Sequence, residues 1–72
     1  MNTNEIKKII RDSFNLKDEP SEYSQKAIEE WDSLGHLNLI MELEQALNIR
    51  FKSHDIPQLT SLKEIERAIN EQ

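Results

Sequence analysis

Residues 32–47 read DSLGHLNLIMELEQAL, and the apolar residues in this stretch recur with the spacing of an α-helix rather than the alternation of a strand. Either Asp32 or Ser33 can cap the first turn, so we expect a helix from Ser33 to about Leu47. At about 100° per residue its apolar side chains form two stripes. The broader stripe comprises Leu39, Ile40, Leu43 and Leu47, and the second comprises Leu34, Leu37 and Met41.

The second stripe lies next to Ser33 and allows two interpretations. A helix at the centre of a bundle would bury both of its stripes. Alternatively, the second stripe is a docking patch beside Ser33, where the flexible thioether of Met41 suits a surface that meets several partners. The sequence leaves both interpretations open.

The N-terminal half contains a second helical pattern followed by a long connection. A helix is predicted to begin after Asn2 or Thr3, either of which can cap it, because one face collects apolar residues. These residues are Ile6, Ile9, Ile10 and Phe14. Residues 15–32 show no sustained period and include Pro20. Connections of this length usually have a function, although a short helical turn around residues 24–29 would also explain the length of this connection.

The C-terminal part contains a short element and a last helix. Residues 53–56 can form about one helical turn before Pro57 interferes. Ser61 and Glu64 have the spacing of a capping box. The helix that follows has its apolar face at Leu62, Ile65 and Ile69.

Length and composition agree with a helical protein. A chain of 72 residues is long enough for one domain, and one Gly with two Pro favours helices. We therefore expect an all-α fold, a small four-helix bundle of three main helices and one short helix, formed by residues 1–72 as a single domain. The chain has no Cys and no apolar run long enough for a membrane span or a signal peptide, so we expect a cytoplasmic protein.

The net charge of −5 is concentrated in one segment. Residues 27–49 contain five acidic residues and no basic residue, whereas the flanking segments are balanced. The acidic residues are Glu29, Glu30, Asp32, Glu42 and Glu44. Such a segment repels the phosphate backbone of nucleic acids and attracts basic protein surfaces. Nucleic-acid binding is therefore not expected.

Asp32, Ser33 and His36 are the residue types of a hydrolytic triad, but their spacing opposes one. At the start of a helix Asp32 cannot readily orient His36 while Ser33 also faces a substrate, and a small bundle offers little room for a cleft. We expect His36 to be a partly buried, hydrogen-bonded side chain and His54 to lie in a loop or cap. No metal-binding pattern or glycine-rich phosphate loop is present, so we expect no catalytic activity of the chain's own.

One family shares this arrangement of residues. The stretch Asp32-Ser33-Leu34, followed by Leu37, Leu39-Ile40-Met41, Leu43-Glu44 and Leu47, resembles the modification site and second helix of the acyl carrier protein family, the phosphopantetheine-binding carrier proteins. The order of predicted elements is also similar to that family over essentially the whole chain.

The resemblance implies that a phosphopantetheinyl transferase attaches 4′-phosphopantetheine from coenzyme A to Ser33, with Asp32 and Leu34 beside the attachment point. The thiol of that arm would carry an acyl group as a thioester. The implied partners are an acyl- or aminoacyl-activating ligase and acyltransferase or synthase enzymes. A carrier that presents Ser33 to several enzymes in turn is best served as a monomer.

The resemblance also implies a partner-binding surface on this helix, formed by Leu34, Leu37, Met41, Glu42 and Glu44. The chain departs from the carriers of fatty-acid synthesis, because Gly35, Asn38 and Gln45 stand where those place acidic residues. This departure favours a dedicated pathway of lipid or secondary-metabolite biosynthesis over housekeeping fatty-acid synthesis. Two alternatives stay open: an aminoacyl or peptidyl carrier of a small freestanding system, and an unmodified helical interaction domain in which Ser33 is only a cap.

Overall fold

The computed structural model of the protein describes residues 3–71. Within this range it contains three α-helices and one short 3₁₀ helix: α1 (Thr3–Ser13), α2 (Ser33–Leu47), η1 (Ile56–Gln58) and α3 (Leu62–Asn70). The expected all-α fold is confirmed, and the short fourth helix is a single 3₁₀ turn. No helix in residues 3–71 is both long and apolar enough to cross a membrane.

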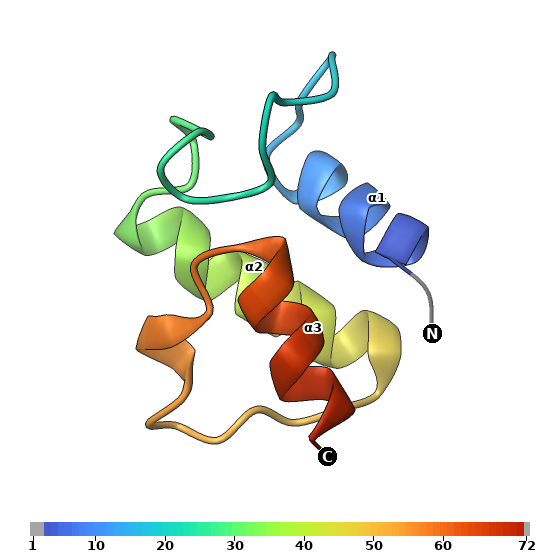
Figure 1. Ribbon diagram of the computed structural model, residues 1–72, viewed down its shortest axis with the longest axis vertical. Coiled ribbons are helices and arrows are strands. Elements are labelled where there is room, and N and C mark those ends of the chain that lie inside the picture. The colour runs from blue at the N-terminus through green and yellow to red at the C-terminus, as the bar shows by residue number, and fades with distance from the viewer. Residues whose placement is uncertain (1–2, 72) are drawn as a thin grey trace.

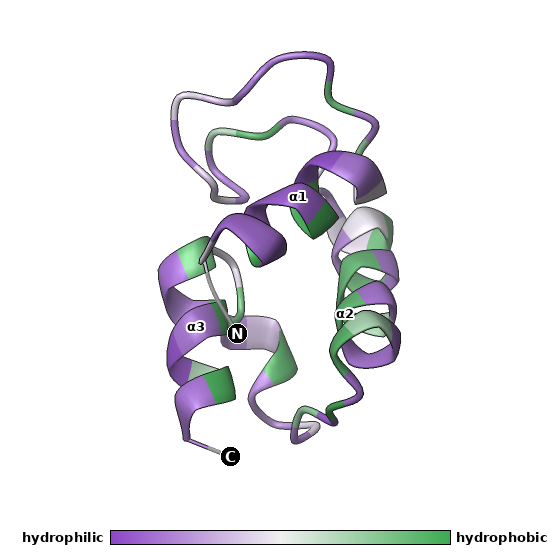
Figure 2. Cartoon of the chain, turned by 90° about the vertical axis from the view of Figure 1, so that its right-hand side faces the viewer, coloured by the Kyte–Doolittle hydropathy of each residue, from purple (hydrophilic) through white to green (hydrophobic). Residues whose placement is uncertain are grey.

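The three helices pack around one core. α1 contacts both α2 and α3, and the α1–α2 connection extends beyond one end of the helices (Figure 1). Figure 2 shows that α2 is the most hydrophobic of the three, whereas α1 and α3 are mostly hydrophilic. The buried apolar residues of the described range are Ile6, Ile10, Phe14, Tyr23, Ile28, Trp31, Leu39, Ile40, Leu43, Phe51, Leu59 and Ile65. The connections therefore contribute to the core together with the helices.

The long α1–α2 connection is held in place by the segment that leads into α3. Ser24 and Ser61 form an isolated antiparallel bridge. In this bridge Gln25 N donates to the Thr60 carbonyl and Leu62 N donates to the Tyr23 carbonyl, each at 2.8 Å. Residues 24–28 make the expected helical turn, closed by a 2.9 Å hydrogen bond from Ile28 N to the Ser24 carbonyl, but it does not extend into a helix.

The N-terminal caps of the two later helices are as the sequence indicated. Asp32 caps α2, which begins at Ser33 and ends at Leu47, so the alternative cap, Ser33, is wrong. Ser61 caps α3, and its Oγ accepts a 3.3 Å hydrogen bond from Glu64 N. In both helices a short oxygen-bearing side chain satisfies a backbone N–H group that has no partner in the helix.

Two expectations about helix ends need correction. Thr3 lies inside α1 and does not cap it, and its hydroxyl donates a hydrogen bond to Glu66 of α3. The other candidate cap, Asn2, lies outside the described residues. Pro57 does not stop the short element but lies within η1, near its start. Proline fits there because its fixed φ suits a helical turn and its missing N–H would have no partner in any case.

Candidate functional site

Ser33 is the first residue of α2, and its side chain is exposed. The cap is formed by its neighbour: Asp32 Oδ1 accepts from Gly35 N at 2.8 Å, and the Asp32 carbonyl accepts from His36 N at 2.7 Å. Because Asp32 supplies the cap, the Ser33 hydroxyl is not needed for it and has no hydrogen-bond partner within residues 3–71. The hydroxyl is therefore available for chemistry at a helix N-terminus.

His36 lies one turn after Ser33 but is turned into the protein, with 8% of its surface exposed. Trp31 Nε1 donates to His36 Nδ1 at 2.9 Å, and His36 Nε2 lies 2.7 Å from the Ile56 carbonyl. Because an indole N–H can only donate, Nδ1 must be the acceptor and Nε2 must carry the proton that is donated to Ile56. Both ring nitrogens are occupied, so His36 cannot serve as a base for Ser33. The expectation of a buried, hydrogen-bonded histidine is confirmed.

Aromatic rings hold the start of α2 against the rest of the core. The Trp31 ring centroid lies 5.5 Å from that of Phe14, the residue that follows α1, and 6.2 Å from that of His36. This row of rings joins the end of α1, the connection and α2, and the hydrogen bond from His36 to the Ile56 carbonyl extends it to η1. Ser33 therefore projects from a backbone that is fixed from several sides.

Gly35 is required by a close approach of the chain. A Cβ atom added to Gly35 would lie 2.6 Å from the Glu30 carbonyl oxygen and 2.9 Å from Phe14 Cε1. The first distance is to backbone, so relief would need the connection to move. The sequence patterns did not indicate this close approach at Gly35. The signal that could have indicated it is the single glycine of the chain standing in the first turn of a helix.

The second stripe of α2 is exposed. The exposed fractions are 75% for Leu34, 54% for Leu37 and 56% for Met41, and these are the large exposed hydrophobic residues of the described range. The interpretation in which α2 buries both stripes is therefore wrong, because α2 packs on the core only through the side that carries Leu39 and Leu43. We call Leu34, Leu37 and Met41 the apolar stripe.

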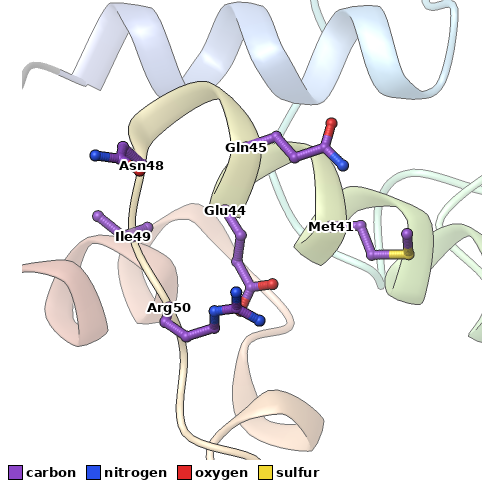
Figure 3. Close-up of a pocket in the computed structure, with 6 residues that line it drawn as sticks. All are labelled: Met41, Glu44, Gln45, Asn48, Ile49 and Arg50. Carbon is purple, nitrogen blue, oxygen red and sulfur yellow. The ribbon is translucent and has the colours of Figure 1, made fainter.

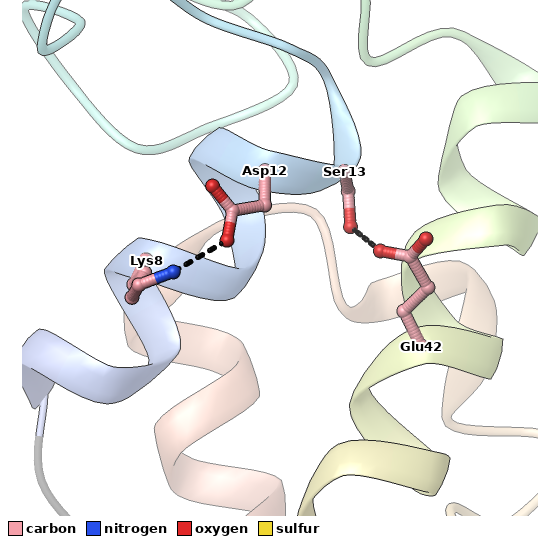
Figure 4. Close-up of polar contacts among 4 residues, drawn as sticks. All are labelled: Lys8, Asp12, Ser13 and Glu42. Atoms are coloured by element: carbon pink, nitrogen blue, oxygen red, sulfur yellow. Dashed lines mark hydrogen bonds and ion pairs between the residues drawn. The ribbon is translucent and has the colours of Figure 1, made fainter.

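The two acidic residues of α2 bind other parts of their own chain. Glu42 is exposed and accepts a hydrogen bond from the Ser13 hydroxyl at the end of α1, close to the Lys8–Asp12 ion pair of 2.8 Å (Figure 4). Glu44 is half-buried, and its Oε2 accepts a 2.9 Å hydrogen bond from Phe51 N in the segment after α2. Both carboxylates thus fasten α2 to its neighbours, and no local pattern of residues indicated these two contacts.

The remaining polar candidates lie apart from Ser33. His54 is in the turn before η1, as expected for a loop residue, and its Nε2 lies 3.4 Å from Asp55 Oδ1. Among the described residues no three His, Cys, Asp or Glu side chains are grouped so that they could hold a metal ion.

Comparisons with known proteins identify the fold. No protein-family model and no curated protein matches the sequence. Among solved structures, the chain is similar to the solution structure of a holo acyl carrier protein from Geobacter metallireducens. The TM-score is 0.80 and the identity 27%, covering 96% of this chain and 82% of that chain. The fold is that of an acyl carrier protein.

This similarity supports a carrier-protein role and gives no indication of catalysis by the chain itself. In this fold Asp32, Ser33 and Leu34 lie together at the start of α2. The apolar stripe begins at Leu34 and continues along the same helix to Met41. Glu42 and Glu44 flank that stripe rather than lying on it. The geometry thus offers one free hydroxyl and one exposed apolar surface beside it.

The hydrogen bond between Trp31 and His36 can be tested by Trp31→Phe. The substitution keeps an aromatic ring but removes the indole N–H, which leaves His36 Nδ1 buried without a donor. We expect the free energy of unfolding, measured with urea, to fall by about 1–3 kcal/mol. If Trp31→Phe lowers the free energy of unfolding by less than about 0.5 kcal/mol, this hydrogen bond does not hold the site in place.

The close packing at Gly35 predicts that Gly35→Ala destabilises the protein, although alanine is normally the better helix former. Overpacking against the Glu30 carbonyl should lower the free energy of unfolding by about 1–3 kcal/mol in the same assay. Asn38→Ala, an exposed change on the same helix, is the control and should stay within about 0.5 kcal/mol of the wild type. A stabilising effect of Gly35→Ala would contradict the packing described.

Proposed function

We propose that the protein is an acyl carrier protein that bears an acyl group as a thioester on a 4′-phosphopantetheine arm attached to Ser33. The observation that carries the proposal is the free, exposed hydroxyl of Ser33 at a helix N-terminus capped by its neighbour Asp32. The similarity to a holo acyl carrier protein supports it, because a holo carrier is one that holds its prosthetic group.

The position of Ser33 suits the attachment of a phosphate. In the transfer, the Ser33 oxygen replaces the adenosine bisphosphate part of coenzyme A at phosphorus, which leaves a phosphodiester on the protein and a free thiol at the far end of the arm. The first N–H groups of a helix have no partner in the helix, so those of Ser33 and Leu34 can face the phosphodiester. The helix dipole favours the negative charge there by about 0.3–1 kcal/mol when the site is exposed.

Asp32 contributes by forming the cap without blocking the site. Its carboxylate is bound to Gly35 N, which fixes the first turn of α2. The Ser33 hydroxyl then projects from a preformed helix end rather than from a mobile loop. The bound carboxylate, the free hydroxyl and the two free N–H groups together make up the proposed attachment site.

The carrier supplies position, and its partners supply catalysis. A short flexible arm gives the thioester an effective concentration in the mM range at an enzyme that has bound the carrier. We propose that a phosphopantetheinyl transferase, an acyl- or aminoacyl-activating ligase and acyltransferase or synthase enzymes act on Ser33 or its arm. We further propose that residues 1–72 act as a single, monomeric, cytoplasmic carrier domain.

A dedicated biosynthetic pathway fits α2 better than housekeeping fatty-acid synthesis. Gly35 has no room for a side chain, and Asn38 and Gln45 are uncharged. Glu42 and Glu44 are engaged by Ser13 and Phe51. An enzyme that recognises carriers through an acidic helix would therefore find few of its ion pairs here.

The proposal is tested by incubating the protein with coenzyme A, Mg²⁺ and a broad-specificity phosphopantetheinyl transferase, and then measuring its intact mass. The wild type should gain one phosphopantetheine and Ser33→Ala none. Because Asp32 supplies the cap, the free energy of unfolding of Ser33→Ala should stay within about 0.5 kcal/mol of the wild-type value. Ser21→Ala, a change of an exposed serine in the preceding connection, is the matched control and should be modified like the wild type.

Two results would contradict the proposal. A gain of mass by Ser33→Ala would place the modification elsewhere. The absence of any gain by the folded wild type with two different transferases would favour the alternative of an unmodified interaction domain.

A further inference from the structure

The two hydrogen bonds of His36 admit only the neutral form of its ring. Nδ1 accepts from Trp31 Nε1 at 2.9 Å, and Nε2 donates to the Ile56 carbonyl at 2.7 Å. A proton on Nδ1 would face the indole N–H, so that two donors would oppose each other. Trp31 is only 1% exposed, so its displaced N–H would have no water to bind in its place. We call Trp31, His36 and the Ile56 carbonyl the latch.

The charged side chains on α2 and at its end do not compensate a charge on His36. The carboxylate of Asp32 binds the backbone of the first turn, and that of Glu42 binds the end of α1. The carboxylate of Glu44 binds the backbone of the segment after α2, and Figure 3 shows it beside the guanidinium of Arg50 at the C-terminal end of the helix. None of these carboxylates is directed at the imidazole.

The ionisable side chains of the other elements around the latch are exposed or bound elsewhere. They are Arg11, Asp12, Glu29, Glu30, Asp55, Glu64 and Arg67. Asp55 is the neighbour of Ile56 in sequence, and its Oδ1 lies 3.4 Å from His54 Nε2. Within residues 3–71 no ion pair joins any of these side chains to His36. A proton on the ring would therefore add a buried charge without a partner.

We propose that the latch is a pH-sensitive switch: when His36 takes up a proton, the first turn of α2 is released from the α1–α2 connection. The proton, taken from water, binds the Nδ1 lone pair that otherwise accepts the indole N–H. The folded chain holds the ring neutral, whereas the unfolded chain leaves it free to be protonated. In mild acid the unfolded state therefore binds more protons, so the stability of the fold decreases as the pH falls.

The range of the switch follows from the titration of free histidine, which takes up its proton near pH 6.5. Loss of stability is therefore expected between about pH 7 and pH 5. Free carboxyl groups titrate near pH 4, below this range. The inference goes beyond the proposed function, because it requires no group on Ser33.

The test is urea unfolding of the full chain at pH 7.5 and 5.5, followed by the fluorescence of Trp31, the single tryptophan. The equilibrium constant for unfolding of the wild type should rise about tenfold from the higher to the lower pH. His36→Gln keeps an oxygen to accept from the indole and an NH₂ to donate to Ile56, but it does not titrate, so its constant should change less than about twofold. His54→Gln, at an exposed position, is the matched control and should keep the tenfold rise.

The switch is wrong if the wild type shows no rise in acid, or if His36→Gln shows the same rise as the wild type. A second measurement needs no variant: nitrogen NMR of the histidine rings in the folded wild type. At pH 5.5 the folded protein should still have Nδ1 of His36 without a proton, and a doubly protonated ring in the folded protein would overturn the proposal. Neither measurement involves Ser33, so a failure of the switch leaves the carrier function standing.

Discussion

The structure depends on a buried imidazole that joins three segments with no helical or sheet ladder between them. His36 accepts from the indole of Trp31 and donates to the carbonyl of Ile56, so the α1–α2 connection, the first turn of α2 and η1 meet at one side chain. Both partners have a fixed role, since an indole N–H only donates and a carbonyl only accepts. The imidazole is therefore held as one neutral tautomer, and Ser33 projects from the turn that it fixes.

Much of the fold could be predicted from local sequence patterns, and the features that could not be predicted have physical causes. The limits of α2 and the Ser61 cap could be predicted because cap and apolar period lie in one stretch of sequence. The exposure of the apolar stripe could not, because it depends on which side of α2 the rest of the chain covers. The role of Gly35 was missed for the same reason: it arises where the backbone at Glu30 crosses the first turn. Likewise, the partner of Glu42 is Ser13, which is distant in sequence.

These missed contacts change the interpretation of the candidate site. From the sequence, residues 27–49 formed an acidic segment suited to basic partners. In the structure, three of its five carboxylates are used within the chain: Asp32 as the cap, and Glu42 and Glu44 as links to neighbouring segments. The large side chains that α2 leaves exposed without such a contact are those of the apolar stripe, Leu34, Leu37 and Met41.

The most direct measurement of the central claim is the mass of the protein purified from its own organism. Trypsin should release residues 27–50 as one peptide, in which Ser33 is the single hydroxyl-bearing residue. We predict that this peptide carries one phosphopantetheine, whose free thiol or bound acyl group is revealed by the mass. If the peptide is unmodified in protein from growing cells, Ser33 is not a carrier site and the account is contradicted.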